Sequence, residues 1–153
     1  MLLHIIEQIE ELSMIIDEIK KANIEAMKAR DNISRGALGI VMTKYKILEV
    51  EMKAAGKEIG DIECLNIIQK TLKELSDEKE GYLKAGNSQR VEDITKQENV
   101  LSNYLPKQLS EDEIRDIISS LDDKSVPNVM KHFKMNYAGK VDMSLVNKVL
   151  RSL

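Results

Sequence analysis

Three side chains in this sequence could serve nucleophilic or metal-assisted catalysis, because the chain holds one cysteine and two histidines. A glutamine-amidase site needs a nucleophile, an activating base and an oxyanion hole. Cys64 lies among isoleucine and leucine residues in a helical pattern, which is typical of a small buried hydrophobic residue. His4 and His132 stand at opposite ends of the chain, and neither has a partner at a metal-ligand spacing. We therefore predict no catalytic residue, no metal site and no cofactor.

The bases near the C-terminus form the strongest candidate binding site. Residues 124–153 hold six bases and one acid, whereas residues 110–123 hold six acids and one base. Cations that converge on one face neutralise several phosphates of a nucleic-acid backbone, although solvated surface lysines give the same pattern. Both interpretations stay open. The candidate RNA-binding residues are Lys131, His132, Lys134, Lys140, Lys148 and Arg151.

A second, weaker set of basic residues lies just before and at the start of the helical stretch predicted for roughly residues 33–55. It consists of Lys28, Arg30 and Arg35, with acids such as Glu25 and Asp31 interleaved. Ion pairs between neighbouring turns of a helix explain this set as well as a ligand would.

The first nineteen residues place apolar side chains at alternating spacings of three and four, which is the pattern of a heptad seam. The seam consists of Leu2, Ile5, Ile9, Leu12, Ile16 and Ile19. One interpretation is a long helix that lies on the rest of the protein. The other is a coiled coil that forms a homo-oligomer or binds a protein partner.

The elements that position these residues are predicted to be helices, because helical periodicity runs along the chain and strand alternation is nearly absent. We predict an all-α protein with an N-terminal bundle of about four helices and a small three-helix C-terminal domain. The second helical stretch covers roughly residues 33–55. Asp61 is expected to cap the third helix, and the fourth carries apolar residues as far as Leu105.

Pro106 separates the two predicted domains, residues 1–105 and 106–153. Proline has no N–H to donate and biases the preceding residue away from helical angles, so the fourth helix must end nearby. Ser110 and Glu113 have the spacing of a capping box that starts the next helix. Ser125 and Asp142 are expected to cap the last two helices.

Composition places the chain in a broad class without identifying a reaction. Its 153 residues are 42% hydrophobic and 32% charged, with a net charge of −3 and only 3% aromatic residues. A lone cysteine cannot form an internal disulfide, which favours a reducing compartment. No stretch reaches the roughly 20 apolar residues that cross a bilayer, so we predict a cytoplasmic location and no membrane contact.

Four stretches together resemble the GatB/YqeY family. They are "EAMKARD", "LNIIQKTLK" with "YLKAG", "YLPKQLSEDEI" and "GKVDMSLVNKVL", in that order from about residue 20 to the C-terminus. The family comprises small YqeY-like proteins and the C-terminal helical region of the B subunit of glutamine-dependent aspartyl/glutamyl-tRNA amidotransferase. The resemblance implies that residues 1–19 are an extension of the first helix.

The resemblance implies an all-helical, non-catalytic module that contacts tRNA through its C-terminal basic residues. It also implies a link to carbon–nitrogen ligases with glutamine as amido donor, so an amidotransferase-type enzyme remains an alternative. A protein-protein interaction module that oligomerises through the heptad seam is the other alternative.

Overall fold

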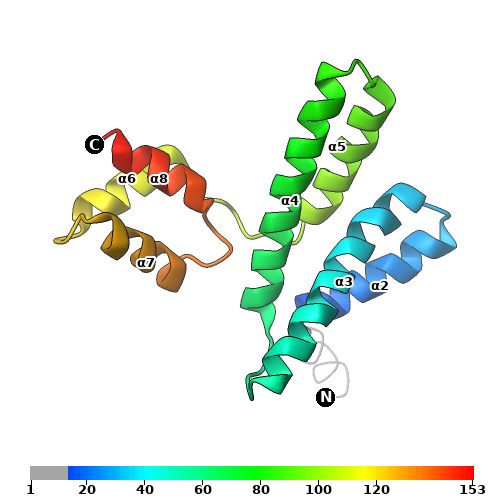
Figure 1. The fold of residues 1–153 in the computed structure, drawn as a ribbon, viewed down its shortest axis with the longest axis horizontal. Coiled ribbons are helices and arrows are strands. Elements are labelled where there is room, and N and C mark those ends of the chain that lie inside the picture. The colour runs from blue at the N-terminus through cyan, green and yellow to red at the C-terminus, as the bar shows by residue number, and fades with distance from the viewer. Residues whose placement is uncertain (1–13) are drawn as a thin grey trace, which may run out of the picture. The chain divides into compact units, whose positions relative to one another are not determined.

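The computed structural model describes residues 14–153. The described part of the chain forms seven α-helices and no strand, which confirms the predicted all-α class (Figure 1). The helices are α2 (Ile15–Lys28), α3 (Asn32–Ala54), α4 (Asp61–Lys84), α5 (Ser88–Ser102), α6 (Glu111–Ser120), α7 (Val126–Asn136) and α8 (Met143–Arg151). None of these seven helices has the length and apolar character needed to cross a membrane.

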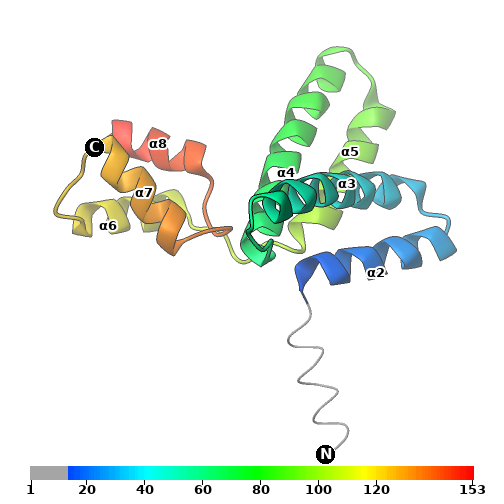
Figure 2. The same cartoon turned by 60° about the horizontal axis from the view of Figure 1, so that its bottom comes forward.

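Contacts divide the chain after Tyr104 into two compact units. Unit 1 ends at Tyr104, and unit 2 is Leu105–Leu153. In unit 1, α2 and α3 form one helical hairpin and α4 and α5 form another, and α3 packs against both helices of the second hairpin (Figures 1 and 2). The most buried side chains of this core are aliphatic. They include Ile19, Leu38, Val41, Ile68, Ile94 and Leu101.

The start of α2 is fixed by an acid that lies 46 positions away in the sequence. The N–H of Ile15 donates to Asp61 Oδ1 at 2.9 Å, and Met14 before it is extended with ψ 152°. Asp61 was predicted to cap its own helix, which is wrong. Gly60 occupies the N-cap position of α4, and its N–H donates to Glu63 Oε2 at 2.8 Å. Asp61 therefore serves the N-terminus of α2, where an acid is favoured by the helix dipole.

Two of the six heptad-seam residues lie in the described part of the chain. Ile16 and Ile19 are 3% and 0% exposed within unit 1, so a single copy of the chain already buries them. The other four seam residues lie outside the described range. They are Leu2, Ile5, Ile9 and Leu12.

The end of α5 comes earlier than the sequence predicts. The helix ends at Ser102, and Asn103 is its C-cap, so Tyr104 and Leu105 lie beyond it. Because Pro106 biases Leu105 away from helical angles, the last turn of helix is lost before the proline. The N–H of Tyr104 donates to the carbonyl of Leu101 at 3.2 Å, which closes the end of the helix.

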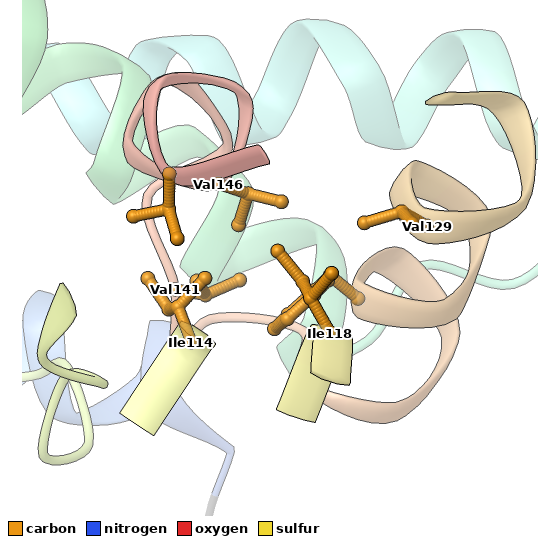
Figure 3. Close-up of a cluster of buried hydrophobic side chains, with 7 residues drawn as sticks. Ile114, Ile118, Val129, Val141 and Val146 are labelled. Atoms are coloured by element: carbon orange, nitrogen blue, oxygen red, sulfur yellow. The ribbon is translucent and has the colours of Figure 1, made fainter. Parts of the chain in front are cut away.

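Unit 2 has its own small core, formed by α6, α7, α8 and the turn before α8 (Figure 3). Its buried residues are Ile114, Ile118, Val129, Phe133, Val141, Val146 and Val149. Each fully buried aliphatic or aromatic side chain contributes roughly 1.5–3 kcal/mol relative to an exposed one. Leu109 packs against this cluster, as a hydrophobic residue just before a helix N-cap often does.

Helix caps set the bounds of unit 2. The predicted capping box is confirmed: Glu113 N–H donates to Ser110 Oγ, and Ser110 N–H donates to Glu113 Oε1, both at 3.2 Å. Asp142 Oδ1 caps α8 by accepting the N–H of Ser144 at 2.9 Å. Ser125 holds the N-cap position of α7 without a side-chain cap bond, so that prediction is wrong in mechanism. Asp123 Oδ1 instead accepts the N–H of Ser125 at 2.9 Å.

Candidate nucleic-acid interface

Two cations of α7 lie on the side of the helix that faces away from the core. Val129 and Phe133 are 0% exposed and point into unit 2. With about 100° of rotation per residue, Lys131 and Lys134 lie about 200° and 140° around the helix from Val129. Both side chains are exposed. They therefore form one cationic edge about 60° wide on the outer face of α7.

Helix α8 repeats this arrangement with the same spacing. Val146 is fully buried, and Lys148 and Arg151 follow it by two and five residues, as Lys131 and Lys134 follow Val129. Lys148 Nζ lies 3.3 Å from Glu111 Oε1 at the start of α6, so this cation is partly neutralised. The outer faces of two helices that share a core point in different directions. The two pairs are therefore separate cationic edges of unit 2.

The turn between α7 and α8 brings in a cation that sequence reasoning missed. The N–H of Leu109 donates to the carbonyl of Lys140 at 2.8 Å. Gln108 Nε2 donates to the carbonyls of Gly139, at 2.7 Å, and of Pro106, at 2.9 Å. These bonds hold the linker after Pro106 against the turn, so the backbone of Lys107 lies close to that of Lys140. Both lysines are exposed, and we name them the basic turn.

Gly139 gives this turn its shape. It has φ +76°, a left-handed conformation that a side chain disfavours, and it is buried under the linker. The N–H of Lys140 donates to the carbonyl of Tyr137 at 2.9 Å, which continues the turn from the end of α7. The motif "YLPKQLS" therefore has a structural role that connects the linker to the last helices.

His132 is held in a defined orientation at the side of α7. Asn136 Nδ2 lies 3.3 Å from His132 Nδ1 and also donates to its carbonyl at 2.9 Å. The imidazole contacts the ring of Phe133 edge-on, with centroids 5.9 Å apart, and lies 6.0 Å from the ring of Tyr137. His132 is half-buried.

The second basic set lies at the turn between α2 and α3 in unit 1. Arg30 has φ +55° and closes α2, since the N–H of Asp31 donates to the carbonyl of Ala26 at 2.9 Å. Lys28 lies 3.7 Å from Glu25, and Arg35 is exposed in the first turn of α3. The three cations of the second set thus share one end of the hairpin.

Asp31 is the acid at the centre of this hairpin end. The Ser34 hydroxyl and N–H donate to it at 2.6 and 3.1 Å, and Lys96 Nζ of α5 pairs with it at 3.0 Å. These hydrogen bonds, and then the nearby lysine, lower the pKa of Asp31 from 3.8 to about 2. Asp31 is the N-cap of α3, so its charge is also favoured by the helix dipole.

The lone thiol is in the core of unit 1. Cys64 is 0% exposed, as the sequence predicts for a small buried hydrophobic residue. Burial, with a smaller contribution from Asp61, raises the pKa of the Cys64 thiol to about 11. A thiol with that pKa is protonated at neutral pH, and the thiolate is the nucleophilic form. Within residues 14–153, no group of three His, Cys, Asp or Glu side chains could hold a metal ion.

These features define an all-α protein whose smaller unit carries exposed cations on two helix edges and on the turn between them. The chain belongs to the YqeY-like protein family, whose model matches residues 16–153. The match therefore overlaps the predicted N-terminal extension, residues 1–19, by four residues. A comparison with curated proteins gives no match.

Proposed function

We propose that this chain is a non-catalytic, YqeY-like accessory module that binds tRNA through unit 2. The main support is the placement of exposed cations around the α7–α8 turn. Lys107 and Lys140 come from separate segments, and the hydrogen bonds of Leu109 and Gln108 bring those segments together. Lysine side chains neutralise phosphates of a nucleic-acid backbone and release its condensed counterions. Lys131 and Lys134 add two exposed cations on α7, whereas Lys148 contributes less because of its pairing with Glu111.

Phosphate contact is favoured over the reading of base sequence. Unit 2 offers few aromatic rings for stacking, and its Phe133 is 0% exposed in the core. Binding through phosphates depends strongly on salt and weakly on sequence. The resemblance to the amidotransferase B subunit supports tRNA as the nucleic acid, with the module acting beside an enzyme that performs the chemistry.

The enzyme alternative has a direct test. An amidotransferase-type reaction with glutamine as donor needs an activated nucleophile, and the buried Cys64 thiol has a pKa of about 11. We expect the protein to release ammonia from glutamine no faster than buffer alone does, with or without aminoacyl-tRNA. Release that is lost in Cys64→Ala would contradict this assignment.

The oligomer alternative loses support from the burial of two seam residues. Ile16 and Ile19 pack inside unit 1, so they are not available to a second copy without opening that unit. A coiled coil through the seam would have to use the other four seam residues, which are Leu2, Ile5, Ile9 and Leu12. Light scattering of the full chain tests this, because a mass that is constant on dilution at the value of one chain excludes the dimer.

The tRNA proposal is tested by charge reversal on the outer edge of α7. We expect Lys131→Glu with Lys134→Glu to weaken binding of total tRNA at least about tenfold at low salt. The matched control reverses Lys20 and Lys21, two exposed lysines of unit 1. Equal binding by the two double variants, with the helical circular dichroism of both intact, would refute the proposal.

A further inference from the structure

The two cationic edges of unit 2 have the same residue pattern. On both helices, the cations lie two and five residues after a buried valine. They are Lys131 and Lys134 on α7, which we name the α7 edge, and Lys148 and Arg151 on α8, which we name the α8 edge. All four side chains are exposed. Any preference of a polyanion for one edge must therefore come from the groups that neighbour each edge.

In the described part of the chain, an acid contacts the α8 edge but not the α7 edge. Glu111 is the first residue of α6, and its Oε1 atom lies 3.3 Å from Lys148 Nζ across 37 positions of sequence. The side chains of Glu111 and Lys148 are 50% and 73% exposed, so a phosphate can reach this ion pair. Within residues 14–153, neither cation of the α7 edge forms an ion pair.

Helix geometry explains why Glu111 reaches α8. It precedes the buried Ile114 by three residues, which places it about 60° around the helix from Ile114, and α6 packs against α8. Asp116 follows Ile114 by two residues, so it lies about 200° around the helix, on the outer face of α6. Glu111 and Asp116 therefore carry the same charge on the same helix, but only Glu111 is on the side of a cationic edge.

The other two acids in the first turn of α6 have different partners. Asp112 Oδ1 lies 3.4 Å from Arg115 Nη1 of the same helix. Glu113 belongs to the capping box, where hydrogen bonds with Ser110 lower its pKa and the charge of Lys107 adds to the effect. Both carboxylates are thus engaged away from α7 and α8. Glu111 is the acid of this turn that contacts a cationic edge.

We propose that Glu111 determines which edge of unit 2 binds a phosphate backbone, by occupying Lys148 and leaving the α7 edge as the preferred one. The inference rests on the proposed function, because it concerns the same cations. Glu111 is part of the same unit as Lys148, so its local concentration is high and does not fall on dilution. A backbone on the α8 edge must displace this carboxylate, whereas one on the α7 edge displaces only counterions. Specificity of this kind combines attraction to one arrangement with repulsion from the other.

A rescue experiment in the full chain tests this assignment. Lys131→Gln with Lys134→Gln removes the α7 edge and should weaken the binding of total tRNA. Adding Glu111→Gln should recover about two- to fivefold in affinity, the range expected when an exposed ion pair is removed. Adding Lys148→Gln as well should abolish this recovery, because the recovery acts through that cation. The matched control adds Asp116→Asn instead, and should recover less than about twofold at about 0.15 M salt, where charges more than about 8 Å apart are largely screened.

Elution of the same variants from immobilised heparin separates this inference from the tRNA proposal, because heparin is a polyanion that requires no recognition of tRNA. Glu111→Gln in the variant without the α7 edge should raise the salt concentration of elution, and Lys148→Gln should lower it again. Equal recovery by Glu111→Gln and Asp116→Asn, including no recovery by either, would overturn the assignment, and so would recovery that persists in Lys148→Gln. The expected order on heparin without any binding of tRNA would contradict the proposed function but not the role of Glu111.

Discussion

The carboxylate of Asp31 gives a quantitative prediction about stability, because it connects the α2–α3 turn to α5. The substitution is Asp31→Asn, which keeps the size of the side chain and an acceptor oxygen but removes the charge. In the folded protein, the Ser34 hydroxyl and N–H and the Lys96 ammonium hold the pKa of Asp31 at about 2, against 3.8 for the free group. Removing the charge therefore removes the stability that accompanies this lower pKa.

The structure sets the expected magnitude. One pKa unit corresponds to about 1.4 kcal/mol, so the full effect would be about 2.5 kcal/mol. The side chains of Asp31 and Lys96 are 27% and 53% exposed, and solvent screening weakens ion pairs of this kind. We expect Asp31→Asn to lower the free energy of unfolding by about 1–2 kcal/mol at neutral pH.

The pH dependence has a definite sign. The pKa of Asp31 is lower in the folded chain than in the unfolded chain, so the ionised carboxylate stabilises the fold above the unfolded value of 3.8. This contribution is lost as the pH falls from 3.8 to about 2. The difference in unfolding free energy between the parent chain and Asp31→Asn should therefore be constant near neutral pH and shrink in acid.

Urea unfolding, followed by helical circular dichroism at a series of pH values, measures this difference. In a Lys96→Met background the loss caused by Asp31→Asn should be smaller, because the ion pair is already absent. A difference that stays the same between neutral pH and about pH 3, or an Asp31→Asn protein as stable as its parent, would refute the assignment of the low pKa to these contacts.

Three further predictions concern single positions. Gly39→Ala should raise the unfolding free energy by about 0.5–1 kcal/mol, since its Cβ meets nothing within 4 Å. At Gly36 a Cβ would lie 2.9 Å from Gln97 Nε2, and moving that amide would weaken its hydrogen bond to the Ile33 carbonyl, so Gly36→Ala should gain less. Urea titrations compare the two variants, and equal gains would contradict this reasoning. Phe133→Ala should lower the unfolding free energy of unit 2 by about 3–5 kcal/mol and leave the unfolding of unit 1 unchanged. Calorimetry of the variant should then show two separate unfolding transitions, and a single transition that shifts as a whole would contradict this. Gln108→Ala should destabilise unit 2 by about 1–2 kcal/mol through its lost bonds to two carbonyls, and amide exchange that stays slow at Lys140 would contradict that role.

Local patterns in the sequence predicted the helices and several of their ends. The heptad spacing, Pro106 and the Ser110–Glu113 pair each act over a few residues. The helix or helix end that each pattern produces can therefore be predicted from the sequence alone. The all-α class and the burial of Cys64 follow from the same periodicity. The position of the last turn of α5 was missed because the effect of Pro106 extends back through Leu105 to Ser102.

Long-range contacts explain what the sequence could not supply. Asp61 caps α2 across 46 positions, and Gln108 reaches Gly139 across 31. Nothing in the local spacing distinguishes Lys107 as a neighbour of Lys140, so the basic turn emerges only from the fold. The sequence also did not show which face of α3 is exposed. Ile40, Ile47 and Val50 have the spacing of a core face, but they are exposed and lie opposite the face of α3 that is buried.

The most direct test of the central claim is the salt dependence of tRNA binding by the full chain. The logarithm of the binding constant should fall linearly with the logarithm of salt concentration, with a slope that counts the phosphates contacted. Replacing Lys107 and Lys140 together by glutamine should reduce that slope by about 2, one for each lysine. The paired control replaces Lys20 and Lys21 of unit 1 by glutamine and should leave the slope unchanged. Identical slopes for the parent and the basic-turn variant, or no salt-dependent binding by the parent chain, would contradict the account.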